Sequence, residues 1–134
     1  MIIFSGGNKL LTPEGRIKAA CLHYLERRNI YAWNNTTGAV QVRPGKFLRF
    51  GKVGSSDIIG LLPDGRFLAV ETKAPDGRVS PEQLAFLEKI RGLGGVAIVV
   101  RSWRELDTAL RREGYVDDGP LFEKPDAGAV GLEG

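Results

Sequence analysis

The sequence predicts an α/β domain in which a mixed central β-sheet is flanked by helices. Residues 12–28 have the cap and the apolar spacing of an amphipathic helix. Two apolar runs joined by a turn predict an antiparallel hairpin over residues 58–70. A second capped helix, over residues 80–91, is followed by the apolar strand 96–100, and this order implies a right-handed parallel crossover. The expected sheet is mixed, because the hairpin supplies an antiparallel pair of strands and the crossover supplies a parallel pair.

The length and composition are those of one ordinary globular domain. The chain has 134 residues, of which 43% are hydrophobic and 26% are charged. Its single cysteine, Cys21, excludes an internal disulfide and favours a reducing compartment such as the cytosol. No segment approaches the ~20 apolar residues of a membrane span. We expect residues 1–116 to form the domain and residues 117–134 to be a flexible acidic tail.

The first helix begins at Thr12, a favoured cap, with Pro13 in its first turn. Apolar positions then recur at helical spacing, at Ile17, Ala20, Cys21, Tyr24 and Leu25. Glu14 lies one turn before this stripe, and its carboxylate is explained by the helix dipole alone. The alternative is that Glu14 joins Asp57 and Glu71 of the hairpin in a metal site.

The pattern changes to β after residue 29. Strands are predicted over residues 30–33, 39–43 and 46–50, and Pro44-Gly45 fits the centre of a type II turn. Four aromatic residues occur in this region, namely Tyr31, Trp33, Phe47 and Phe50. Such residues can stack on nucleic-acid bases, but we expect at least half of them to pack in the core.

The same region is strongly basic. No acidic residue occurs between Glu26 and Asp57. The basic residues in this interval are Arg27, Arg28, Arg43, Lys46, Arg49 and Lys52. A basic run that leads into a group of carboxylates fits a polyanion guided onto a metal site. The simpler alternative is a solvated basic surface.

The turn of the central hairpin decides which side chains meet at its open end. Pro63-Asp64-Gly65 suits a three-residue loop with glycine in the left-handed third position. Counting outward from this loop places Asp57 opposite Glu71. Because side chains alternate along a strand, Lys73 then projects on the same face as Glu71. A two-residue loop would turn Asp57 to the opposite face.

Two carboxylates and an ammonium at the end of a buried hairpin need partners, because burial of an unpaired charge is costly. Mg²⁺ prefers carboxylate and carbonyl oxygens and completes its shell with water and substrate phosphate. The sequence therefore predicts a magnesium site there. The alternative is that Glu71 and Lys73 form an ordinary solvated pair and that Asp57 is a turn residue.

Two capped helices follow the hairpin. Ser80 and Gln83 form a capping box at the start of the first helix. Because Gln83 comes just after the strand of Glu71, a second role that faces the site is also open to it. Ser102 and Glu105 predict a second capping box for the last helix.

Several other chemistries find no support in the sequence. His23 is the only histidine and Cys21 the only cysteine, which excludes zinc sites built from these residues and argues against a histidine base. Gly51-Lys52 is followed by valine, so no Walker phosphate loop is present. Residues 92–97 match a dinucleotide fingerprint loosely, but they follow a helix and precede a strand, which is the wrong order.

The segment from Asp57 onward resembles a known nuclease family. Asp57, thirteen further residues and then Glu71-Thr72-Lys73 are similar to the D…E-x-K signature of the PD-(D/E)XK nuclease superfamily. The continuation through Ser80-Pro81-Glu82-Gln83, a helix, a valine-rich strand and Arg101-Ser102 is similar to its VRR-NUC branch. The resemblance covers roughly residues 12–112, with Ser56 in the place of the proline that precedes the aspartate in the superfamily.

This resemblance implies a restriction-endonuclease-like core and a metal-dependent phosphodiesterase that acts on DNA. By position, Asp57 and Glu71 would ligate Mg²⁺ or Mn²⁺ together with the backbone carbonyl of Thr72. Lys73 would position the attacking water and stabilise the charge that develops on the phosphate. Asp57, Glu71 and Lys73 are therefore the central residues of the implied site.

Glu14 and Gln83 extend this implied site. Glu14 is similar to the glutamate of the family's first helix, which helps to hold a second metal or a water, and Gln83 is similar to its supporting glutamine. The residues that we expect to contact DNA are Arg43, Lys46, Arg49, Lys52, Ser55, Ser56 and Arg78.

Stand-alone members of this branch resemble dimeric junction-resolving nucleases that are often encoded by phages. The resemblance therefore implies a homodimer that acts on branched DNA such as a Holliday junction, in a bacterial or phage-infected cytosol. Two alternatives stay open at this point. One is flap, single-strand or restriction-type cleavage by the same site. The other is a non-catalytic nucleic-acid-binding module in which the carboxylates are structural.

Overall fold

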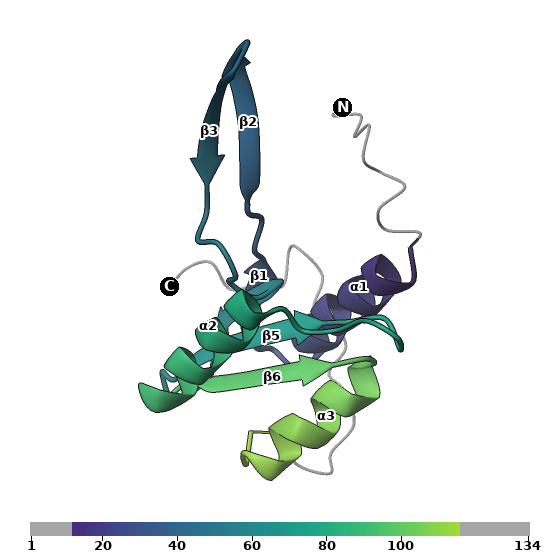
Figure 1. Ribbon diagram of the computed structural model, residues 1–134. Helices are drawn as coiled ribbons and strands as arrows, with labels where there is room; N and C mark the ends of the chain where they lie inside the picture. The colour runs from purple at the N-terminus through teal and green to yellow at the C-terminus, as the bar shows by residue number, and fades with distance from the viewer. Residues whose placement is uncertain (1–11, 116–134) are drawn as a thin grey trace, which may run out of the picture.

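The computed structural model describes residues 12–115 (Figure 1). The expected domain boundary at residue 116 and the expected acidic tail lie outside these residues. Within the described range, no helix is long and apolar enough to cross a bilayer.

Four strands form one mixed sheet in the order β1-β4-β5-β6. β1 (Tyr31–Asn34) pairs antiparallel with β4 (Ile58–Leu61), and β4 pairs antiparallel with β5 (Phe67–Thr72). β5 pairs in parallel with β6 (Val96–Val100), and α2 (Pro81–Gly92) connects these two strands. The predicted mixed α/β sheet is therefore confirmed.

Helices cover both faces of this sheet (Figure 1). α1 (Pro13–Arg27) and α3 (Trp103–Arg112) pack together on one face, and α2 packs on the other. The core under α1 and α3 contains Cys21, Tyr24, Leu25, Ile30, Ile58, Leu62, Leu68, Val70, Val96, Val100, Leu106 and Leu110. The core under α2 contains Ile59, Ala69, Leu87 and Ala97. The central strands β4 and β5 lie between these two cores and therefore carry apolar side chains on both faces.

β2 (Gly38–Arg43) and β3 (Lys46–Phe50) form a separate two-stranded sheet. We call this hairpin, residues 38–50, the β2–β3 arm. The arm projects away from the four-stranded sheet (Figure 1), and every residue of its two strands is exposed. Residues 12–115 therefore form a compact body and one extended hairpin.

The expectation that at least half of the aromatic residues in this region pack in the core is wrong. Tyr31 and Trp33 are 71% and 45% exposed, and Phe47 and Phe50 are 61% and 44% exposed. Trp33 pairs with Ile59, whose face is covered by α2. The core under α2 covers β4, β5 and β6 but not the edge strand β1, so both β1 aromatics face solvent. The other two stand on the arm, away from both cores.

The β4–β5 hairpin has the predicted three-residue loop. The backbone N–H of Leu62 donates to the carbonyl of Arg66 at 2.9 Å, and Gly65 has a φ of 91°. The observed register places Asp57 opposite Glu71, one position beyond the last paired residues of the two strands. The prediction that depended on this loop is confirmed.

The helix caps follow the sequence with one difference. The caps of α1 and α2 are as predicted, including the complete capping box of α2. In α3 the Ser102 hydroxyl accepts from the backbone N–H of Glu105 at 3.1 Å. The Glu105 carboxylate, however, accepts from the N–H of Arg101 and not from that of Ser102. The second capping box is therefore incomplete, because this side chain reaches one residue further back.

Candidate metal centre

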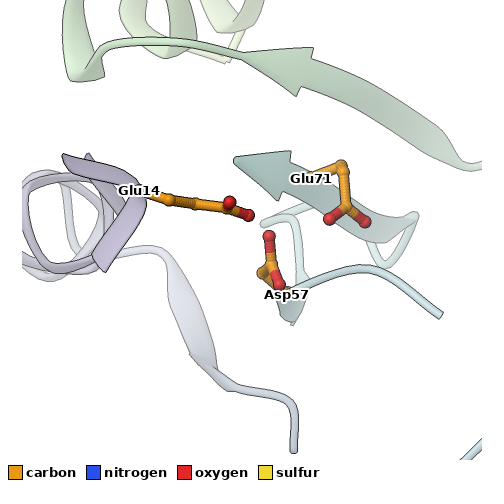
Figure 2. Close-up of side chains that lie close together, drawn as sticks. All are labelled: Glu14, Asp57 and Glu71. Carbon is orange, nitrogen blue, oxygen red and sulfur yellow. The ribbon is translucent and has the colours of Figure 1, made fainter. Parts of the chain in front are cut away.

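Three carboxylates from separate elements point toward one another (Figure 2). Glu14 lies in the first turn of α1, Asp57 in the segment before β4, and Glu71 on β5. One oxygen of each carboxylate lies within 4.8 Å of the other two. Carboxylates this close repel one another when ionised, and a divalent cation among the oxygens would remove that repulsion.

Asp57 is held by Thr72 at the end of β5. Its Oδ2 accepts from both the backbone N–H and the hydroxyl of Thr72, each at 2.9 Å. Two donors on one oxygen fix the orientation of the carboxylate relative to β5. Sequence reasoning assigned Thr72 only a backbone carbonyl and missed this role of its side chain.

Glu71 is almost completely buried, with 1% of its surface exposed. Its Oε1 accepts from Gln83 Nε2 at 3.1 Å and lies 4.0 Å from Lys73 Nζ. Its Oε2 is also buried and has no hydrogen-bond partner among the residues that the structure describes. One oxygen of this carboxylate is therefore well held, and the other lacks a partner.

These surroundings raise the pKa of Glu71 from an ordinary value of 4.5 to about 9. Burial is the largest cause, the nearby Asp57 carboxylate is the next, and the Lys73 ammonium opposes both. At neutral pH the metal-free protein therefore keeps a proton on Glu71. A bound cation would take the place of that proton.

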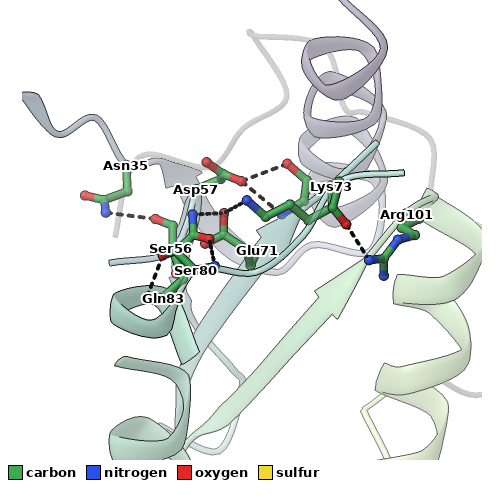
Figure 3. Close-up of polar contacts among 10 residues, drawn as sticks. Asn35, Ser56, Asp57, Glu71, Lys73, Ser80, Gln83 and Arg101 are labelled. Atoms are coloured by element: carbon green, nitrogen blue, oxygen red, sulfur yellow. Dashed lines mark hydrogen bonds and ion pairs between the residues drawn. The ribbon is translucent and has the colours of Figure 1, made fainter. Parts of the chain in front are cut away.

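Gln83 uses both ends of its side-chain amide. Its Oε1 accepts from the backbone N–H of Ser80 at 2.9 Å, which completes the capping box of α2. Its Nε2 donates to Glu71 (Figure 3). The start of α2 is therefore connected directly to the carboxylate cluster, and both roles that the sequence left open for Gln83 occur together.

Lys73 is buried where β5 ends. Its backbone N–H donates to the carbonyl of Val100 at 3.0 Å, which extends the pairing of β5 with β6 by one residue. Arg101 donates from Nη2 to the carbonyl of Gly77 at 2.9 Å and so holds the loop that follows Lys73. The ammonium is thereby placed beside Glu71 by backbone pairing as well as by its own charge.

Asn35 connects both ends of the β2–β3 arm to the site. Its side chain donates to Ser55 Oγ at 2.7 Å and to the carbonyl of Ser56 at 2.9 Å. Its backbone N–H donates to the carbonyl of Asp57 at 2.7 Å. Sequence reasoning missed this residue, although an asparagine directly after a strand is a recognised sign of local side-chain to backbone bonding.

The residues expected to contact DNA do not all lie in similar places. Four are exposed on the arm or just after it, namely Arg43, Lys46, Arg49 and Lys52. Arg78 is exposed in the loop after Lys73, and Ser55 is partly buried against Asn35. Ser56 is completely buried, and its hydroxyl donates to the carbonyl of Ile58 at 2.9 Å. The expectation that the Ser56 side chain contacts DNA is therefore wrong, because this side chain packs inside the fold.

A comparison with protein families accounts for this arrangement. The family model of the VRR-NUC domain matches residues 14–103, a range that begins at the first carboxylate and includes the rest of the cluster. No curated protein and no solved structure matched the chain. VRR-NUC domains are nucleases of the PD-(D/E)XK type, with DNA as their substrate class. The chain therefore belongs to the VRR-NUC domain family of PD-(D/E)XK nucleases.

Proposed function

We propose that the chain is a Mg²⁺- or Mn²⁺-dependent endonuclease that hydrolyses phosphodiester bonds of DNA. The observation that carries the metal requirement is the buried Glu71 Oε2, which has no partner among the described residues. Two other carboxylates lie within 4.8 Å of Glu71. Without a cation, this carboxyl group avoids an uncompensated buried charge only by keeping a proton. A divalent cation supplies the missing interaction and compensates the neighbouring charges.

The donor set suits a hard cation. Asp57 and Glu71 offer carboxylates from facing positions, and Glu14 offers a third, for the same ion or for a second one. The family resemblance adds the backbone carbonyl of Thr72. The cluster contains no histidine or cysteine, which favours Mg²⁺ or Mn²⁺ over zinc. When bound, such an ion polarises a phosphoryl oxygen and lowers the pKa of a coordinated water.

We assign two roles to Lys73. It positions the attacking water, and it stabilises the negative charge that develops on the phosphate. Its ammonium is buried near Glu71, where the local dielectric is low. A cation in such surroundings stabilises developing charge more strongly than the same cation in water. Gln83 is a positioning residue in this scheme, because its contact with Oε1 would hold the Glu71 carboxylate in place while Oε2 stays without a partner among the described residues.

We further propose that the enzyme is a homodimer selective for branched DNA, with a four-way junction as the model substrate. One centre of this kind cleaves one strand, so resolution of a junction needs two centres. The formal charge of the chain is +3, and residues 27–56 contain basic but no acidic side chains. This charge distribution supports binding to a polyanion.

The test is cleavage of a labelled four-way junction, with a linear duplex of matched sequence beside it. The wild type should cut the junction in Mg²⁺ or Mn²⁺ and be inactive in EDTA. Asp57→Asn preserves the size of the side chain and removes its charge, so we expect it to abolish cleavage. Full activity of this variant would contradict the proposal.

Asp64→Asn is the matched control. Asp64 lies at the other end of the same hairpin and is exposed, so the variant should cut at the wild-type rate. Melting temperatures of both variants show that a loss of activity is not a loss of folding. Equal rates on the junction and the linear duplex would remove the claim of structure selectivity and leave the nuclease claim intact.

A further inference from the structure

The β2–β3 arm contributes no residue to either core of the described structure. A two-stranded hairpin that stands alone in water is only marginally stable. The arm nevertheless exposes every residue of both its strands (Figure 1). Its surface is therefore available to a partner outside the chain.

The charge of the arm indicates the chemistry of that partner. Arg43 and Lys46 are directly paired across the tip, and Arg49 follows on β3. Like charges placed opposite each other destabilise a hairpin. No acidic residue occurs from residue 27 to residue 56 to compensate them. A polyanion at the tip would remove this repulsion, so the arm is complementary to phosphate.

The shape and the apolar residues of the arm fit duplex DNA. A strand of six residues spans about 20 Å, and the major groove, about 12 Å wide, admits a two-stranded ribbon. Val40 and Leu48 are paired on one face, and Phe50 lies on the same face. Exposed apolar side chains of this kind contact thymine methyl groups or enter between base steps.

The chain segments before and after the arm are bonded to each other beside the carboxylate cluster. Asn35 lies before the arm, bonds Ser55 and Ser56 after it, and donates to the backbone of Asp57. DNA held by the arm would therefore be placed at a defined position relative to Asp57. A hairpin joined to the body by a loose linker would not have this property.

We propose that the β2–β3 arm docks duplex DNA by entering a groove, with its cations on the phosphates. This proposal rests on the proposed nuclease function, because it places the substrate of the same site. It adds the element that holds the substrate.

The test measures binding of a labelled 30-base-pair duplex by fluorescence anisotropy in EDTA, so that no cleavage can occur. The full-length double variant Lys46→Gln, Arg49→Gln should bind on the order of tenfold more weakly at moderate salt. Its slope of log affinity against log salt should be less steep than that of the wild type by about 1.8, the value for two lost phosphate contacts.

The matched control is Lys89→Gln, Arg112→Gln, which removes two exposed charges at the ends of α2 and α3. It should bind within about twofold of the wild type. An arm variant with unchanged affinity and slope, or an equal loss in the control, would overturn the proposal.

Calorimetry with Mn²⁺ separates this proposal from the nuclease proposal. The arm variant should bind Mn²⁺ as the wild type does, because the cluster is untouched. If the wild type binds no Mn²⁺ and the arm variant still binds DNA more weakly than the wild type, the metal centre is contradicted and the docking arm remains supported.

Sedimentation without DNA tests the competing occupant, a second copy of this chain. The apolar double variant Val40→Thr, Leu48→Ser should leave the oligomeric state of the wild type unchanged. Dissociation of a wild-type dimer by these two substitutions would assign the apolar face of the arm to a subunit interface and overturn the proposal.

Discussion

At the scale of the residue, Glu71 makes the stability of the metal-free protein depend on pH. Its pKa of about 9 in the fold lies above the ordinary value of 4.5, so between these values the folded chain keeps a proton that the unfolded chain releases. This contribution to the free energy of unfolding is complete below pH 4.5 and is lost as the pH rises through 9. Glu71→Gln cannot release this proton. We therefore expect the variant to melt at a higher temperature than the wild type in EDTA at pH 8.

Scanning fluorimetry between pH 5 and pH 9 measures this effect. The difference in melting temperature between Glu71→Gln and the wild type should grow as the pH rises. Glu88→Gln, on the exposed side of α2, is the control and should show a difference that does not change with pH. A constant difference for Glu71→Gln as well would contradict the raised pKa.

The sequence was enough to predict the positions of those cluster residues that depend only on the turn of the β4–β5 hairpin. Once the three-residue loop is assigned, strand alternation is enough to bring Asp57, Glu71 and Lys73 together. Thr72 was missed because alternation places its side chain on the face opposite Glu71. Its hydroxyl nevertheless donates to Asp57 Oδ2 at 2.9 Å, a contact that the position of Asp57 opposite Glu71 does not by itself predict. Asn35 was missed because its partners lie on the far side of a 13-residue arm.

At the scale of the element, the β2–β3 arm is separable from the body. Its removal takes no residue from either core in residues 12–115, and Asn35 and Ser55 lie outside it. We expect replacement of residues 38–50 by a short glycine-serine linker to lower the melting temperature by no more than about 3 °C, as is usual for changes outside a core. Calorimetry should find Mn²⁺ binding unchanged.

Deletion of Gly65 alone is the informative comparison. A two-residue loop shifts the register of the β4–β5 hairpin, and a shift of one residue turns every side chain of a strand to the other face. This small deletion should abolish Mn²⁺ binding and lower stability far more than loss of the whole arm. A stable Gly65 deletion that binds Mn²⁺ would contradict the dependence of the site on this loop.

The helices and strands were largely predictable, and the separation of the arm was not. Caps, apolar spacing and glycine positions mark where elements begin and end, and they are local signals. The sequence of β2 and β3 indicates two strands and a turn in the same way whether the hairpin joins a sheet or stands apart from it. Only tertiary contacts distinguish the two cases, which is why the exposure of Phe47 and Phe50 was not predicted.

At the scale of the whole molecule, the carboxylate cluster lies where the three layers of the fold meet. Glu14 belongs to a helix on one face of the sheet, Asp57 directly precedes the central strand β4, and Glu71 lies on the central strand β5. Gln83 belongs to the helix on the other face and bonds Glu71. A cation held here would therefore stabilise the entire fold. At a concentration of 100 times its Kd the stabilisation is about 2.7 kcal/mol.

We therefore expect saturating Mn²⁺ to raise the melting temperature of the wild type by roughly 10 °C at pH 8. The increase should be smaller at pH 6, because the cation must displace the proton on Glu71 and this becomes harder as the pH falls below about 9. Asp57→Asn and Glu71→Gln should both lose the increase. Glu14→Gln should retain part of it, because two of the three carboxylates are still present. An increase of the same size in Asp57→Asn would show that Mn²⁺ binds elsewhere. The burial of Glu71 would then be a consequence of packing and not of metal binding.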